Sequence, residues 1–576
     1  MRAKLGWGCS VLSLACSASA PAAAPPPAEL TLLHTSDVHS RLWSFRDRVS
    51  SLDAEMGLGS EGELAEVGGA ARLATLLAAE RRRGAAVWVD SGDLLEGAPV
   101  FGAHGGAVEV GLWGALGVAA MALGNHELSL GAAELDRLFG PARFPVLAAN
   151  LVPSATTGAW LAPSATVMAG HTRLRVIGVG HDGSPPSITA SSNPWGLSVM
   201  GAAASVQAAM DAAAGGAALV VVLSHLGLEG DRDLLRGTTG VDVVLGGHQH
   251  VSTLEPEWQE DCATRELQQR RGCSPRRVPI VHSGAYGRYL SKVALRLRPD
   301  PQEPGALEVQ AVALTHLPVT SQVPEDPATA AHLEPYRPAP RPPVGYLPAP
   351  LTRSSALGGD SPLGNVVADA VRAQTGADVV VLNSSGLRDD LEAGPLLPID
   401  LELAFPFEEP WRLASLAGRE LRVGLDRAAR KSASRGCESA LQVSGLWLRV
   451  HCGACREELT TCWRAGRGES ELRDDERLLV ALPRYLTLPG ADFEAVGPLG
   501  SELSLSLSQA LRRQFGTVPL VRDPGDCARD WQQAPASRCA EAFGLWCPLD
   551  GARAWSVCAA LPQVEGGRDG RIEMLP

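Results

Sequence analysis

One stretch decides how the first half of this chain folds: Ala119-Ala-Met-Ala-Leu-Gly-Asn-His-Glu127. The run Ala119–Leu123 is uncharged and is followed by a glycine, which predicts a short buried strand. An open α/β sheet presents its chemistry at the carboxyl ends of its strands. The triplet Asn125-His126-Glu127 therefore marks a candidate site, although a single His or Asn at a strand end often has only a structural role.

Four further apolar runs end in polar residues of the same kind. These are Leu30–Leu33 with Asp37 and His39, Ala85–Val89 with Asp90 and Asp93, Leu219–Leu223 with Ser224 and His225, and Val241–Leu245 with His248 and His250. Packing alone does not require Asp, Asn or His at five strand ends. The recurrence predicts one site that collects these side chains.

Seven of these residues form a ligand set for two metal ions: Asp37, His39, Asp93, Asn125, His225, His248 and His250. Residues two apart in an extended chain point the same way, so Asp37 and His39 can bind one ion, which His250 completes. Asp93 can bridge to a second ion, because a carboxylate has two oxygens. Mixed oxygen and imidazole ligands favour zinc, manganese, iron or cobalt over calcium. Two such ions, roughly 3.5–4 Å apart, can polarise a phosphate and activate water.

The composition limits the partners of the chain. Its 576 residues carry a net charge of −13, and 45% of them are hydrophobic, as in ordinary globular proteins. A chain this acidic is a poor general binder of nucleic acid or of an anionic membrane. If the substrate is a phosphate, something other than net charge must attract it, and metal ions are the natural candidate.

Residues 1–28 predict an export segment and a Pro/Ala-rich spacer. Arg2 and Lys4 precede the short apolar run Leu5–Ala15, and Ala18-Ser-Ala20 resembles a cleavage site. Cleavage before Cys16, which would carry a lipid anchor, is the alternative. The apolar run is too short to span a bilayer, and no later stretch reaches the length of a spanning helix, so we expect no transmembrane helix in the mature chain. The predicted location is periplasmic, cell-envelope or secreted.

The cysteines fit an exported chain. Two of the twelve lie in the export segment, and the other ten form even groups: Cys262 and Cys273; Cys437, Cys452, Cys455 and Cys462; and Cys527, Cys539, Cys547 and Cys558. Such groups predict disulfides, and the isolated first pair predicts one bond directly. The second group has a zinc site as its alternative. Each group of four allows three pairings.

The chain divides into two α/β domains. Residues 29–316 alternate apolar strands with helical stretches, predicted at Gly69–Arg83, Ala132–Phe139 and Ala203–Ala213. Residues 317–350 are rich in proline, which predicts a stiff linker with one short helix at 328–333. A second domain follows at 351–520, opening with a helix near Leu363, and a Cys-rich tail at 521–576.

The order Asp-x-His, Gly-Asp, Gly-Asn-His-Glu, Ser-His and Gly-Gly-His-x-His resembles the calcineurin-like metallophosphoesterases. Among these enzymes, the motif Leu33–Ser40 and the presence of a second domain resemble one family in particular. It contains 5′-nucleotidases, UDP-sugar hydrolases and 2′,3′-cyclic-nucleotide phosphodiesterases. The resemblance covers roughly residues 29–515. It implies a four-layer α/β/β/α sandwich with two metals, a smaller C-terminal α/β domain that binds the nucleoside, and His126 as the catalytic histidine.

The resemblance also assigns substrate residues in the second domain. Asn383-Ser-Ser-Gly-Leu-Arg388 matches a family motif at both ends, Phe407 and Tyr485 correspond to rings that hold a base, and Asp492 lies in a further motif. Core packing is the alternative for the two aromatic residues.

Two departures from the family bear on the substrate. Ser129 stands where an Asp usually orients the catalytic histidine, and Gly359 replaces an arginine, for which Arg353 is a nearby substitute. The sequence thus predicts a metal-dependent phosphoesterase acting on nucleotides. The alternatives are 2′,3′-cyclic nucleotides, UDP-sugars or other phosphate esters, and a surface binding protein with reduced activity.

Overall fold

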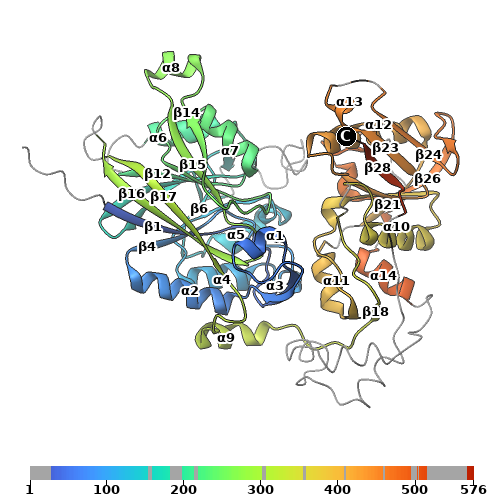
Figure 1. Cartoon of the computed structure of the whole chain (residues 1–576), viewed down its shortest axis with the longest axis horizontal. Helices are drawn as coiled ribbons and strands as arrows, with labels where there is room; N and C mark the ends of the chain where they lie inside the picture. Colours follow the sequence, from blue (N-terminus) through green and yellow to red (C-terminus); the bar gives the residue numbers. More distant parts are fainter. Residues whose placement is uncertain are drawn as a thin grey trace, which may run out of the picture.

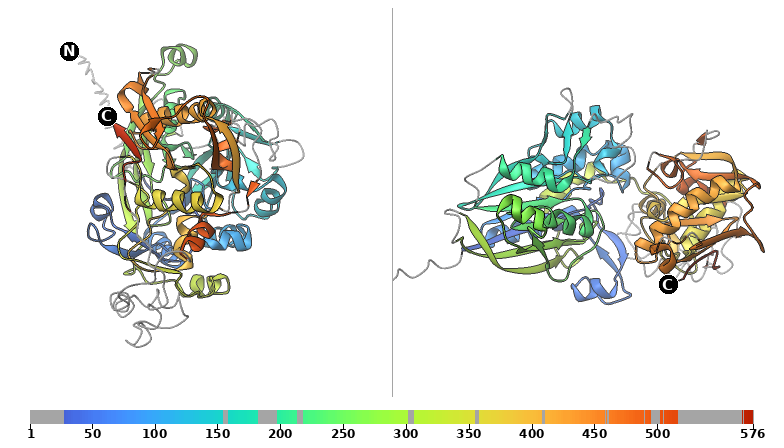
Figure 2. Two further views of the ribbon diagram at one scale, coloured as in Figure 1. Left: turned by 90° about the vertical axis from the view of Figure 1, so that its right-hand side faces the viewer. Right: turned by 90° about the horizontal axis from the view of Figure 1, so that it is seen from above.

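Two α/β domains lie side by side (Figure 1), and the view from above, on the right of Figure 2, shows the same arrangement. The computed structural model describes residues 28–153, 158–181, 197–212, 218–300, 306–354, 358–407, 410–457, 459, 461–488, 490–494, 502–503, 505–515, 567 and 569–575. The predicted export segment with Cys16, and the four cysteines of the tail, lie outside these residues. Within them, no helix has the length and apolar character needed to cross a membrane.

Two sheets form the centre of the first domain. One consists, in order, of β17 (Leu307–Pro318), β16 (Tyr289–Pro299), β1 (Ala28–Thr35), β4 (Ala86–Asp90), β5 (Met121–Ala122), β6 (Val146–Leu147) and β8 (Leu161–Ala162). The other consists of β14 (Glu257–Asp261), β15 (Arg276–His282), β13 (Val243–Gly246), β12 (Leu219–Ser224), β10 (Thr172–Val179) and β9 (Ser164–Ala169). The five strands expected from the sequence are thus divided between two sheets.

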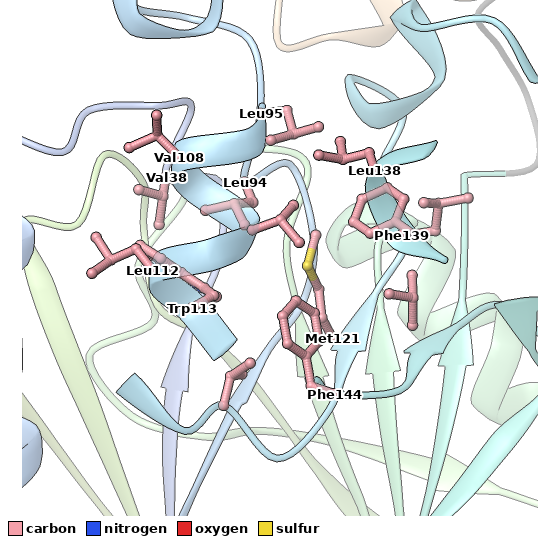
Figure 3. Packing of buried hydrophobic residues seen from close by; sticks show 14 of the residues in the cluster. Val38, Leu94, Leu95, Val108, Leu112, Trp113, Met121, Leu138, Phe139 and Phe144 are labelled. Atoms are coloured by element: carbon pink, nitrogen blue, oxygen red, sulfur yellow. The ribbon is translucent and has the colours of Figure 1, made fainter. Parts of the chain in front are cut away.

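Side-chain alternation along the strands builds the layers. Leu32 of β1 faces the second sheet, in one core with Val221 and Leu245. Leu33, the next residue, faces the opposite side and joins a core with residues of α2 (Ala70–Arg83), α4 (Ala107–Leu116) and α5 (Ala132–Phe139), shown in part in Figure 3. On the outer face of the second sheet, α6 (Ala202–Asp211) and α7 (Gly227–Arg236) pack in the same way. The predicted α/β/β/α sandwich is therefore confirmed.

The Pro-rich segment packs largely against the first domain. Its helix α9 (Pro327–Leu333) lies on α2, and Leu333 is 2% exposed in the core beneath it. The short η2 (Glu334–Tyr336) follows, and β18 (Gly345–Leu347) already pairs with β20 (Gly394–Leu396) of the second domain. Residues 337–344 form the connection between the two domains.

The second domain is built around one mixed sheet. Its order is β22 (Leu441–Ser444), β19 (Val379–Asn383), β26 (Arg477–Pro483), β21 (Trp411–Ala417) and β27 (Glu502–Leu503). One face packs against α10 (Pro362–Thr375), α11 (Pro398–Ala404) and α14 (Leu507–Phe515), and the other against α12 (Gly418–Ser434). The smaller C-terminal α/β domain is therefore confirmed as well.

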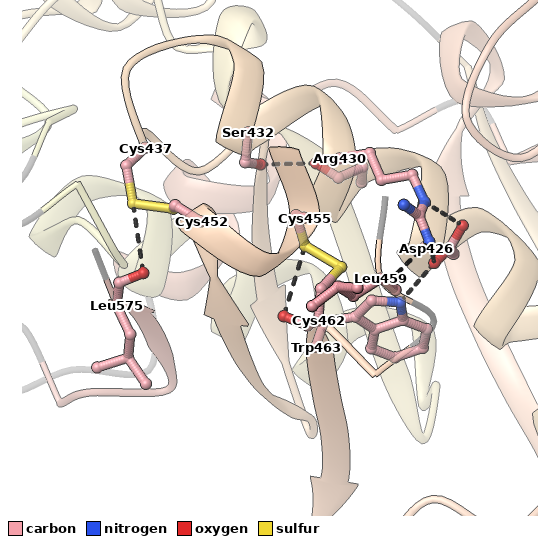
Figure 4. The surroundings of a disulfide bond; sticks show 11 residues. Asp426, Arg430, Ser432, Cys437, Cys452, Cys455, Leu459, Cys462, Trp463 and Leu575 are labelled. Atoms are coloured by element: carbon pink, nitrogen blue, oxygen red, sulfur yellow. Dashed lines mark hydrogen bonds and ion pairs between the residues drawn. A yellow bond between two sulfur atoms is a disulfide. The ribbon is translucent and has the colours of Figure 1, made fainter. Parts of the chain in front are cut away.

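Disulfides fasten the outer part of this domain (Figure 4). Cys437 bonds to Cys452 and Cys455 bonds to Cys462, so all four sulfurs are used and the zinc alternative is wrong. Both bonds involve α13 (Cys452–Arg456), which follows β23 (Trp447–His451). The described end of the predicted tail, β28 (Ile572–Leu575), pairs in parallel with β23 and so belongs to the same body.

The first domain carries one disulfide in its described residues, between Cys262 and Cys273, with Cα atoms 6.3 Å apart. This bond is the predicted one. It closes a short excursion that contains α8 (Arg265–Arg271).

Candidate metal centre and active site

All seven predicted ligand residues meet where the two sheets end. Strand pairing aligns these ends, since Thr35 of β1 pairs with Asp90 of β4 and Ser224 of β12 pairs with Gly246 of β13. His39 Nε2 lies 2.9 Å from His250 Nε2, His225 Nε2 lies 2.9 Å from Asp93 Oδ2, and His248 Nδ1 lies 2.9 Å from Asn125 Oδ1. The loops of two different sheets thus supply one cluster.

The cluster divides into two groups of three residues. Asp37, His39 and His250 form one, and Asp93, His225 and His248 form the other. Asp93 lies between them, because its Oδ2 is 2.9 Å from His225 Nε2 and 3.8 Å from His39 Nε2. A third group joins His39, Asp93 and His126, so the His126 ring also lies within reach of ligand atoms.

Backbone carbonyls fix the rings of two histidines. His39 Nδ1 donates to the carbonyl of Glu96 over 2.8 Å, and His225 Nδ1 donates to the carbonyl of Ser91 over 2.7 Å. Each ring therefore turns its Nε2 into the cluster. Metal-binding histidines in proteins are oriented in this way.

The loops adopt a backbone conformation that residues with a Cβ rarely adopt. Positive φ angles occur at five of the ligand residues, namely Asp37 (53°), His39 (51°), Asp93 (54°), His248 (79°) and His250 (59°). Asp37 and His39 therefore do not lie on an extended segment. Their side chains meet as predicted, but the extended backbone from which this was predicted is wrong. Strained residues that cluster in this way are a feature of functional sites.

Glycine and a buried acid hold Asp93 in place. A Cβ on Gly124 would clash with Asp93 Oδ1, so only glycine fits there. The fully buried Glu127 carboxylate accepts the N–H groups of Gly124, Asp93 and Leu95 at 2.8, 3.1 and 3.0 Å. Glu127 thus ties the loop after β5 to the loop after β4.

The charges of the cluster suit divalent cations. Burial lowers the pKa of His39, His248 and His250, which keeps these rings in the neutral form that binds metals. Burial acts in the same direction on His225, but the charge of Asp93 outweighs it and raises the pKa to about 10. His225 carries the positive charge that the buried carboxylates attract, and a metal ion would supply that charge in its place.

His126 has a partner that the sequence did not indicate. Its backbone N–H donates to Asp93 Oδ1 over 2.8 Å, and its ring Nδ1 lies 2.6 Å from Glu96 Oε2. Burial opposes protonation of His126, but the charge of Asp93 and the contact with Glu96 raise its pKa above the usual value. Ser129, in η1 (Glu127–Ser129), is exposed. The one sequence signal for Glu96 is its place in the loop that carries Asp93.

Two predicted substrate residues reach the cluster from the second domain. Arg388 Nη2 lies 3.1 Å from His39 Nε2 and 3.3 Å from His250 Nε2. The Phe407 ring stacks on His126, with ring centroids 5.5 Å apart and planes inclined by 18°. The domains are also joined by an ion pair between Arg41 and Asp389 at 2.8 Å. The second domain therefore covers the cluster directly.

The other predicted substrate residues lie elsewhere in the second domain. Asn383 ends β19 and donates through Nδ2 to Ser385 Oγ over 2.9 Å. Tyr485 lies in η4 (Arg484–Thr487) and packs beside the core under α12. Asp492 is 8% exposed, and its Oδ2 lies 3.6 Å from Lys431 Nζ. Arg353 is engaged by Asp390, to which its backbone N–H donates over 2.8 Å.

Two further rings lie at the cluster and were not predicted from the sequence. His181 follows β10 and lies with its ring centroid 4.2 Å from that of His248. The apolar run before Gly180 has the same pattern as the other strand ends and could have revealed it. Tyr286 lies with its ring centroid 5.2 Å from that of His250, and the sequence around it carries no such signal.

Comparison with known proteins decides the family. A model described as calcineurin-like phosphoesterase matches residues 30–252, and one described as 5′-nucleotidase, C-terminal domain, matches residues 343–497. The chain therefore combines a calcineurin-like phosphoesterase domain with a 5′-nucleotidase C-terminal domain. This phosphoesterase is a metal-dependent hydrolase of the 5′-nucleotidase type, and the alternative of a non-catalytic surface protein is not favoured.

Individual relatives agree with this phosphoesterase assignment. The 5′-nucleotidase of Bos taurus is 27% identical over 520 residues, which cover 82% of this chain and 85% of that protein. Snake venom 5′-nucleotidase of Gloydius brevicauda is 31% identical over 49% of this chain and 46% of that protein. The crystal structure of a 5′-nucleotidase precursor from Thermus thermophilus superposes with a TM-score of 0.72 at 23% identity, covering 95% of this chain and 99% of that one, which shows the shared fold.

Proposed function

We propose that this phosphoesterase hydrolyses nucleoside 5′-monophosphates with two divalent ions. The observation that carries the proposal is the meeting of the seven ligand residues with Arg388 and Phe407 of the second domain. Two such ions, if bound there, would polarise a phosphate and lower the pKa of a water molecule. Zinc, manganese, iron or cobalt suit the mixed donors.

The seven residues would hold two ions that share Asp93. The first ion would be held by Asp37, His39, Asp93 and His250, and the second by Asp93, Asn125, His225 and His248. This division is supported by the two groups and by the place of Asp93 between them.

His126 would act on the phosphate without holding an ion. Its Nδ1 is engaged by Glu96, so Nε2 is the nitrogen available to the phosphate or to the leaving oxygen. A histidine in this position can donate a proton to the leaving group, which typically contributes about 10²–10⁴-fold to the rate.

The second domain would select the nucleoside. Arg388 brings a positive charge beside the two ligand rings, where a phosphate would lie. Phe407 covers the His126 ring, so a substrate has to displace it, and a base can then take the place of His126 on the Phe407 face. Asn383, Tyr485 and Asp492 are proposed to complete the nucleoside site.

We also propose export. Three disulfides fit an oxidising compartment, and one relative is a venom protein by its name. The mass of the mature amino terminus would distinguish cleavage after Ala20 from a lipid-modified Cys16.

The test of the substrate is a panel assayed with the metal-loaded protein. It compares nucleoside 5′-monophosphates with 2′,3′-cyclic nucleotides, UDP-sugars and 4-nitrophenyl phosphate, with chelator-treated protein as the control. We expect the 5′-monophosphates to show the highest kcat/KM. A higher value for a cyclic nucleotide or a UDP-sugar would contradict the proposal. The fold alone permits a different substrate. A sulfate thiohydrolase, SoxB of Thermus thermophilus, superposes with a TM-score of 0.67 at 20% identity, covering 85% of this chain and 94% of that one.

A further inference from the structure

Glu96 contacts the site through both its side chain and its backbone. Its Oε2 lies 2.6 Å from His126 Nδ1, and its carbonyl accepts from His39 Nδ1 over 2.8 Å. The side chain is 20% exposed, so the carboxylate is shielded from much of the solvent. Glu96 is thus in contact with the proposed catalytic histidine and with a proposed metal ligand at once.

The backbone at Glu96 does not explain the choice of this residue. Its φ is 58°, in the left-handed region, which glycine and asparagine adopt far more readily than glutamate. A glutamate occupies this position despite an unfavourable backbone. The side chain, and therefore its contact with His126, is the feature that distinguishes this residue from a glycine.

The carboxylate of Glu96 is the partner of the His126 ring at Nδ1. Asp93 binds the backbone N–H of His126 and not this ring nitrogen. Ser129 is exposed and carries no charge at the position where the resemblance leads one to expect an acid. Two aromatic rings also contact the His126 ring: Phe407 stacks on one face, and His39 makes an edge contact with ring centroids 4.8 Å apart.

We propose that Glu96 is the positioning residue of His126 and takes over the task for which Ser129 is unsuited. The inference rests on the proposed function of His126. The carboxylate accepts the Nδ1 proton, which fixes the orientation of the ring and directs Nε2 to the phosphate. Hydrolysis adds the oxygen of water to phosphorus while the bond to the leaving oxygen breaks. Nε2 gives its proton to that oxygen and regains one from the attacking water, and Glu96 keeps its Nδ1 contact throughout.

A double-mutant cycle on the metal-loaded enzyme tests this role. Glu96→Gln keeps the size of the side chain and removes its charge, and we expect kcat to fall about 10- to 100-fold, a part of the effect of an acid–base histidine. KM and bound metal should stay within about twofold, because the His39 contact uses the backbone carbonyl. In a His126→Ala background, the same change should lower kcat by less than about twofold, since coupled residues are not additive.

Two further variants sharpen the test. Ser129→Asp in the Glu96→Gln background should recover part of the lost kcat, because it returns a carboxylate to the vicinity of His126. Glu134→Gln is the matched control, since Glu134 is exposed on α5 and forms an ion pair with Arg137 of the same helix. It should leave kcat unchanged.

The results that would overturn the proposal are distinct from a failure of the proposed substrate. A wild-type kcat in Glu96→Gln, an equal fall in the His126→Ala background, or loss of metal would each refute it. The cycle is measured with AMP and with ribose 5-phosphate, whose leaving alkoxide also needs a proton, so that a wrong nucleotide assignment leaves the second ester as the reporter. A crystal structure of the metal-loaded protein tests the contact without turnover, and a Glu96–His126 separation beyond about 3.5 Å would also refute it.

Discussion

Replacing Phe407 by alanine should change the kcat/KM for two related substrates in opposite directions. In the structure the Phe407 ring stacks on His126, so a nucleotide exchanges this contact for a stack between Phe407 and its base. A base stack is worth about 1–3 kcal/mol and an aromatic pair about 0.5–1.5 kcal/mol. The difference between the central values is about 1 kcal/mol, so we expect kcat/KM for AMP to fall about fivefold.

Ribose 5-phosphate is the matched substrate, because it has the same sugar and phosphate but no base. Its binding has to break the Phe407–His126 stack without a replacement. Phe407→Ala removes that cost, so we expect kcat/KM for ribose 5-phosphate to rise, by up to about fivefold for about 1 kcal/mol. The measurement is the initial rate of phosphate release at substrate concentrations well below KM.

Phe407→Tyr is the control variant, since it keeps the aromatic face and should leave both rates within about twofold. If both substrates lose the same factor with Phe407→Ala, the ring serves folding and the reasoning is refuted. If neither changes, the enzyme recognises a different leaving group, and the proposed nucleoside site is wrong.

Three other changes test the site. Asp93→Ala should remove the shared ligand, so that metal content by elemental analysis falls and turnover is lost, whereas wild-type values for both would contradict the assignment. His126→Ala should lower kcat for AMP by about 10²–10⁴ and less for 4-nitrophenyl phosphate, whose nitrophenolate leaves without a proton; a lost metal equivalent would instead make His126 a ligand. Gly124→Ala should push Asp93 away and lower metal content. Gly131→Ala is its control, because a Cβ there meets nothing within 4 Å, and it should leave metal content unchanged. Equal effects of the two variants would count against a clash between a Cβ at position 124 and Asp93.

The sequence by itself determined the elements and the residues that they present. Helices such as α5 (Ala132–Phe139) and the apolar strands follow from local hydrophobic periodicity, which depends only on neighbours in the chain. The seven candidate ligands were found because polar residues at strand ends have no local explanation. Cys262 and Cys273 could be paired because no third cysteine lies near them in the chain.

The tertiary structure decided which of these residues meet and which partners they have. The strands β12 and β13 belong to a second sheet, and this division depends on packing between layers. The backbone at Asp37 and His39 is left-handed, whereas their spacing in the sequence suggests an extended segment. The pairing within the second cysteine group, the contact of Glu96 with His126 across 30 positions, and the reach of Arg388 and Phe407 into the cluster all join residues distant in sequence. Such contacts are fixed by loop conformation and domain packing, which no local pattern encodes.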